Sequence, residues 1–125
     1  MHKELLIDKF LDVIECIDII ESRFIVIKSP EDFVESVNGG EKLDSISMRL
    51  QTIGEIINKI YKKEAALLEN YPQVKWSDII GMRNVISHAY MEIDHNIIYK
   101  TCKTHLPVLK ETVKSILNSL NEQKD

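Results

Sequence analysis

One short segment of the 125-residue chain carries guanidinium, amide, hydroxyl, imidazole and phenol groups together: Arg83, Asn84, Ser87, His88 and Tyr90. This set suits phosphoryl transfer without a metal ion. A histidine, which titrates near neutral pH, can take a proton from a ribose 2′-hydroxyl and return one to the leaving oxygen. An arginine fork can neutralise the charge that grows on the phosphate, and an asparagine can orient the imidazole or bind a phosphate oxygen.

The spacing of these residues limits how they can meet. On an ideal α-helix of about 100° per residue, Arg83 and His88 point about 140° apart. Apolar residues such as Met82 and Val85 occupy much of the remaining arc and anchor the segment. Because this angle is wide for two groups that contact one phosphate, we expect the helix to end or bend near Ser87 and the site to be shared by two copies of the chain.

Amphipathic helices are predicted before this segment. Apolar residues recur at three- and four-residue steps from Leu6 to Ile27, a stripe of about six helical turns. Proline and acidic residues in the segment 30–34 predict a short helix, ended by Asn38-Gly39-Gly40. A second long helix is expected from a cap near Asp44 or Ser45 to about Glu69.

Three features of the remaining chain complete the predicted bundle. Gly54, inside the second long helix, suggests close approach of a neighbouring helix. A third helix is expected from Trp76 toward Tyr90, and a last one from about Asp94, kinked or broken at Pro107. Residues 121–125 form a polar tail expected to fray. The sequence thus predicts one all-α domain over residues 1–125, an up-and-down bundle of four to five helices.

Composition excludes several other classes of protein. With 4 Gly and 3 Pro, the chain has too few turn-forming residues for a β-sandwich or barrel. A net charge of −4 excludes a broad basic surface, so any contact with phosphate must be local. Cys16 and Cys102 lie in no metal-binding or redox motif and are expected to be reduced and buried. The N-terminus lacks a signal-peptide pattern and no apolar run could cross a membrane, so we expect a soluble, cytoplasmic protein.

The chain resembles a known family at this segment. The segment resembles the Arg-x4-His-x-Tyr signature of the HEPN superfamily, specifically of its HepT-like toxins. The matching residues are Arg83-Asn84, followed after three further residues by His88-Ala89-Tyr90. Gly81-Met82 before the signature strengthens the resemblance. The first long helix, the stretch 49–55 and the block 76–90 also look like this family.

The resemblance implies a fold and an activity. It implies a HEPN-like helical bundle that forms a homodimer or a higher oligomer, with two copies of the signature facing one another across a cleft. It implies a metal-independent endoribonuclease that uses the 2′-hydroxyl of its RNA substrate as nucleophile. Arg83 and His88 would be catalytic, with Asn84 and Ser87 in support and no cofactor. The partner would be a minimal nucleotidyltransferase (MNT) antitoxin that transfers AMP to Tyr90 and silences the toxin.

Several alternatives remain open from the residues alone. The chain could be a non-catalytic binding or regulatory subunit of a minimal nucleotidyltransferase, or the polar residues could merely hold a dimer together. Three basic residues early on the last helix could extend an RNA groove or form an ordinary solvated face: Lys100, Lys103 and His105. A metal site at His88, Asp94 and His95 matches no zinc-binding pattern, so no metal is expected.

Overall fold

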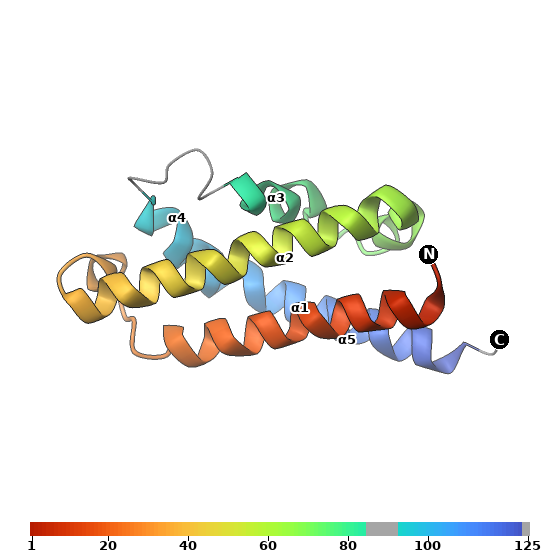
Figure 1. Cartoon of the computed structure of the whole chain (residues 1–125), viewed down its shortest axis with the longest axis horizontal. Helices are drawn as coiled ribbons and strands as arrows, with labels where there is room; N and C mark the ends of the chain where they lie inside the picture. Colours follow the sequence, from red (N-terminus) through yellow and green to blue (C-terminus); the bar gives the residue numbers. More distant parts are fainter. Residues whose placement is uncertain (85–92, 124–125) are drawn as a thin grey trace.

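The computed structural model describes residues 1–84 and 93–123, and all regular structure in these residues is helical (Figure 1). The long elements are α1 (Lys3–Phe24), α2 (Val37–Glu69) and α5 (Leu106–Glu122). The shorter ones are α3 (Trp76–Gly81), α4 (His95–Lys100), the 3-10 turns η1 (Pro30–Phe33) and η2 (Met82–Asn84), and the π-helical turn η3 (Thr101–His105). Helices α1, α2 and α3 alternate in direction along the long axis, and α4, η3 and α5 follow one another in the direction of α2 (Figure 1). The predicted all-α bundle is confirmed.

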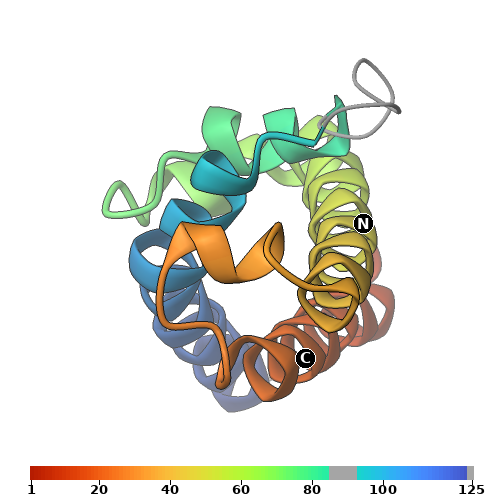
Figure 2. The same cartoon turned by 90° about the vertical axis from the view of Figure 1, so that its left-hand side faces the viewer.

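The hydrophobic core lies where the stripes of α1, α2 and α5 meet. Residues three or four positions apart on each helix have no exposed surface, because this spacing puts them on one helical face. They include Phe10, Val13 and Ile17 on α1, Ile46, Leu50 and Ile53 on α2, and Leu109, Val113 and Ile116 on α5. At one end of the bundle, η1 lies across the opening between the helices (Figure 2), and its Phe33 is fully buried.

The start of α2 differs from the sequence-based expectation. The helix begins at Val37, well before Asp44, and Gly39 and Gly40 lie inside its first turns. The Ser36 hydroxyl caps it by accepting a hydrogen bond from the Gly39 backbone N–H at 2.9 Å. A Cβ on Gly39 would lie 1.9 Å from the carbonyl oxygen of Asp32. The glycine therefore permits η1 to pack directly on the helix and does not end a helix.

We expect opposite effects when these two adjacent glycines are replaced. Gly39→Ala forces η1 away from α2 and should lower the free energy of unfolding by about 2 kcal/mol. The methyl group of Gly40→Ala would lie 3.9 Å from the Phe33 carbonyl oxygen, an ordinary contact. This substitution should therefore raise the free energy of unfolding by about 0.5–1 kcal/mol through helix propensity. Urea denaturation of the two variants measures both changes. Equal stability of the two would contradict the packing described here.

Other boundaries agree with the sequence or shift slightly. Helix α1 ends at Phe24, although Ile27 beyond it is still buried. The last helical segment begins near Asp94, as expected, and the Asp94 carboxylate caps it by accepting hydrogen bonds from the backbone N–H groups of Asn96 at 3.0 Å and Ile97 at 3.3 Å. Pro107, where a kink or break was predicted, lies in the first turn of α5, and the irregular part of the helix is the π-helical turn η3 just before it. Helix α5 continues to Glu122, so the first residues of the predicted tail are helical.

Both cysteines are free and buried, as expected. Burial raises the pKa of the Cys102 thiol to about 12, because a thiolate is poorly solvated in the core. Burial also raises the pKa of Cys16, an effect that the nearby Arg49 guanidinium partly offsets. Burial of both thiols thus disfavours the reactive thiolate form. None of the described helices is long and apolar enough to span a lipid bilayer.

Candidate active site

The backbone that carries Arg83 rests directly on α2. A Cβ on Gly54 would lie 2.6 Å from the Arg83 backbone nitrogen and 3.0 and 3.1 Å from the carbonyl oxygens of Ile79 and Ile80. No side chain larger than hydrogen fits there without moving this backbone. The close helix approach expected at Gly54 is thus confirmed, and its neighbour is the segment that bears the candidate arginine.

Apolar side chains of α3 and η2 fix this segment to the core. Trp76, Ile79 and Met82 are buried, with 5–7% of their surface exposed. The Trp76 indole N–H donates a hydrogen bond to the Tyr71 carbonyl oxygen at 3.1 Å, which satisfies its one polar group. Because these residues face inward, Arg83 is left half-buried and Asn84 exposed at the edge of the bundle.

The third helix is shorter than the sequence suggested. Helix α3 ends at Gly81, and the chain continues as the 3-10 turn η2 through Asn84 rather than as one α-helix from Trp76. A 3-10 turn advances each residue by about 120°, so angles computed for an ideal α-helix do not apply across Arg83. The other expected site residues, Ser87, His88 and Tyr90, lie outside the described residues.

Arg83 has no acidic partner in the described part of the chain. Neither Asp78, which is nearby in sequence, nor any other carboxylate in residues 1–84 or 93–123 forms an ion pair with it. Its guanidinium group is therefore not neutralised by these residues, and its five N–H donors can serve a phosphate.

A groove whose lining includes Gly81 and Met82, the two residues before Arg83, runs between α3 and the α4–η3 segment. We call it the α3–α4 groove; it has a volume of about 430 Å³. Its lining includes Asp78, Ile79 and Met82 on one wall and Ile97, Lys100 and His105 on the other. Lys103 does not line it, and the Lys103 Nζ instead lies 5.6 Å from the centroid of the Tyr99 ring. The structure therefore separates the three basic residues that the sequence could not distinguish.

Comparison with known proteins identifies the family. A model of the family described as "Ribonuclease HepT-like" matches residues 13–116. The chain belongs to this family. Membership supports endoribonuclease activity.

Individual relatives of this HepT-like chain are proteins named as ribonucleases. It is 28% identical over 92 residues to "Putative RNase MJ0125" of Methanocaldococcus jannaschii, covering 74% of this chain and 77% of that protein. It is 30% identical over 104 residues to "Putative RNase MJ1380" of the same organism, covering 79% and 90%. It is 33% identical over 61 residues to "Probable ribonuclease HepT" of Thermococcus cleftensis, covering 49% and 53%. No solved structure gives a significant match.

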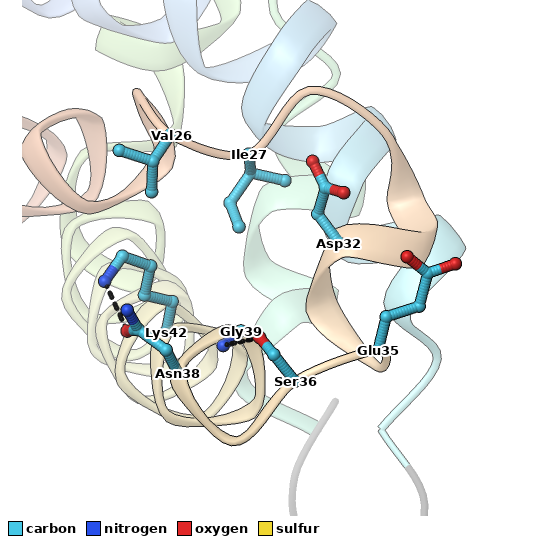
Figure 3. Close-up of a pocket in the computed structure, with 8 residues that line it drawn as sticks. All are labelled: Val26, Ile27, Asp32, Glu35, Ser36, Asn38, Gly39 and Lys42. Carbon is cyan, nitrogen blue, oxygen red and sulfur yellow. Dashed lines mark hydrogen bonds between the residues drawn. The ribbon is translucent and has the colours of Figure 1, made fainter.

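A second pocket of this HepT-like chain, of about 470 Å³, lies at the start of α2 (Figure 3). Its polar side chains are largely engaged with the protein. The Lys42 ammonium donates a hydrogen bond to the Asn38 side-chain oxygen at 2.8 Å, and the Asp32 carboxylate accepts one from the Lys28 backbone N–H at 2.7 Å. Gly39, in its wall, is fifteen residues from Gly54, or about 22 Å along α2. This pocket is therefore separate from the Arg83 site.

The described residues offer no obvious place for a metal ion. No group of three histidine, cysteine, aspartate or glutamate side chains in residues 1–84 and 93–123 is arranged to hold one. Asp94, one member of the metal site considered from the sequence, is hydrogen-bonded as a helix cap. His2 caps α1, where its Nδ1 accepts a hydrogen bond from the Glu4 backbone N–H at 3.3 Å.

Proposed function

We propose that this chain is a metal-independent endoribonuclease toxin whose catalytic residues are Arg83 and His88. The observation that carries the proposal is the placement of Arg83: it lies on a backbone packed against α2, directly after two residues that line a groove, with no acidic partner among the described residues. Family membership supports the same activity. Asn84 and Ser87 assist by orienting the imidazole or by donating hydrogen bonds to phosphate oxygens.

The proposed reaction is a transesterification within the RNA. His88 removes the proton of a ribose 2′-hydroxyl, and this oxygen attacks the adjacent phosphorus. The bond from phosphorus to the 5′-oxygen of the next nucleotide breaks, and the His88 imidazolium returns a proton to this leaving oxygen. Arg83 stabilises the additional negative charge in the transition state through two parallel hydrogen bonds. The products carry a 2′,3′-cyclic phosphate and a 5′-hydroxyl.

We propose further that the working unit is a homodimer. The chain has a net charge of −4, so one subunit offers RNA little positive surface. Two copies related by a two-fold axis would bring two Arg83 and two His88 side chains into one cleft and concentrate positive potential there.

Neutralisation is proposed to involve a minimal nucleotidyltransferase encoded as the antitoxin. This enzyme would transfer AMP from ATP to the Tyr90 hydroxyl, adding bulk and a negative charge where the RNA phosphate must bind. Intact mass spectrometry after co-expression should show this chain heavier by whole AMP units, and Tyr90→Phe should abolish the increase. Neutralised toxicity without any adduct would instead indicate that the partner acts by occlusion.

The activity itself is tested by incubating purified protein with RNA in excess EDTA, beside the His88→Ala variant. We expect the parent to cleave RNA despite chelation and the variant to be inactive. Equal cleavage by both proteins would refute the proposed site. Absence of cleavage by the parent, together with tight binding to the nucleotidyltransferase, would support the alternative role as a non-catalytic subunit.

A further inference from the structure

We infer that the α3–α4 groove binds the nucleotide next to the cleaved phosphodiester of a single-stranded RNA, with Lys100 and His105 contacting its phosphate. This inference rests on the proposed ribonuclease function. It assigns a substrate-binding role to residues outside the HepT-like signature.

The position of the groove is the first argument. Its lining includes Gly81 and Met82, the two residues directly before Arg83. Helices α3 and α4 lie on the same side of α2 (Figure 1), and residues of both helices line the groove. Because this lining adjoins Arg83 in the chain, an RNA strand whose scissile phosphate is bound at Arg83 can extend a neighbouring nucleotide into the groove.

The second argument is the chemistry of its floor and walls. Ile79 and Met82 are buried and give an apolar floor, and Ile97, 55% exposed, gives an apolar rim. Such a surface favours the flat face of a nucleobase. A volume of about 430 Å³ is in the range of pockets that hold a small ligand, roughly 300–1,000 Å³, and accommodates one nucleotide rather than a duplex.

The two walls of the groove differ in charge, with basic residues on one and an acidic residue on the other. Lys100 and His105 are exposed on the α4–η3 wall, and neither forms an ion pair within residues 1–84 and 93–123. Asp78 lies on the opposite wall. A phosphate is therefore attracted to the α4–η3 wall and repelled from the α3 wall, where the Asp78 carboxylate can instead accept a hydrogen bond from a base amino group.

The π-helical turn η3 explains why Lys100 and His105 can act together. Its characteristic hydrogen bond runs from the Leu106 N–H to the Thr101 carbonyl oxygen, five residues earlier. The wider turn places residues five apart near one another, whereas an α-helix aligns residues three or four apart. Lys103, between them in sequence, lies against Tyr99 instead.

A matched set of variants tests the inference. The double variant Lys100→Gln/His105→Gln removes both phosphate contacts, and Lys103→Gln removes an exposed charge outside the groove. The probe is a fluorescein-labelled decamer of 2′-O-methyl RNA, which lacks the nucleophilic hydroxyl, and the readout is its Kd by fluorescence anisotropy. We expect the Kd to rise about tenfold in the double variant, with a shallower salt dependence, and less than twofold in the control.

Cleavage kinetics on the corresponding unmodified decamer separate this inference from the proposed function. We expect the double variant to have a KM about tenfold higher and a kcat within twofold of the parent. The reason is that Lys100 and His105 contact a neighbouring phosphate and not the phosphate that reacts. An unchanged Kd and KM in an active enzyme would overturn the groove assignment and leave the ribonuclease function intact. Weaker RNA binding by the double variant, with no cleavage even by the parent, would retain the groove and refute the ribonuclease function.

Discussion

Replacing Arg83 by alanine is expected to reduce RNA cleavage by about 100-fold or more, which corresponds to about 3 kcal/mol of transition-state stabilisation. The guanidinium group forms no ion pair among the described residues, so its removal breaks no ionic contact there. The melting temperature should therefore change little. Single-turnover cleavage and thermal denaturation of the same preparation measure the two quantities.

Two further variants establish that the effect belongs to this position. Arg83→Lys keeps the charge but loses the planar fork, and should restore little activity. Arg23→Ala is the matched control: the Arg23 side chain donates to the Ile19 carbonyl oxygen within α1 at 3.3 Å, and its loss should leave cleavage unchanged. Full activity of Arg83→Ala would exclude a catalytic role, and a large loss of stability would indicate a structural one.

Replacing Gly54 by alanine should reduce both activity and stability. The added methyl group would lie 2.6 Å from the Arg83 backbone nitrogen, so η2 must move by several tenths of an ångström or more. Overpacking of this kind costs about 1–3 kcal/mol, against a gain of about 1 kcal/mol in helix propensity. We expect a melting temperature lower by roughly 5 °C and cleavage reduced about 10- to 100-fold, because displacement of a catalytic group is costly.

The control for Gly54→Ala is Gly40→Ala on the same helix. It introduces the same methyl group where the nearest atom is 3.9 Å away, and should leave cleavage unchanged. Loss of activity in Gly54→Ala alone would support the view that α2 positions Arg83. Full activity in Gly54→Ala would contradict it.

The long helices were predictable from the sequence because burial follows the 3.6-residue period. Phe10, Leu50 and Val113 lie on periodic apolar stripes and are fully buried. The start of α2 was not predictable, since a Gly-Gly pair is typical of helix ends. Here Gly39 is needed for contact with the Asp32 carbonyl oxygen, a tertiary constraint that local sequence does not encode.

The candidate site was predictable in part. The residue types around Arg83 indicated phosphate chemistry, and Gly54 indicated a close helix contact, but the sequence did not show that these two features meet. It also left Lys100, Lys103 and His105 equivalent. Their separation depends on the π-helical turn η3, which changes the face on which each residue lies. The length of α3 was overestimated because an apolar pattern continues past Gly81.

The most direct test of the account uses an RNA with a single 2′-deoxynucleotide at the main cleavage position, compared in EDTA with the same RNA made entirely of ribonucleotides. We predict that the parent protein cuts the all-ribose RNA to a 2′,3′-cyclic phosphate and leaves the deoxy-substituted bond intact. Cleavage of the deoxy-substituted bond, or cleavage only when a divalent metal is added, would contradict a reaction that depends on the RNA 2′-hydroxyl, His88 and Arg83.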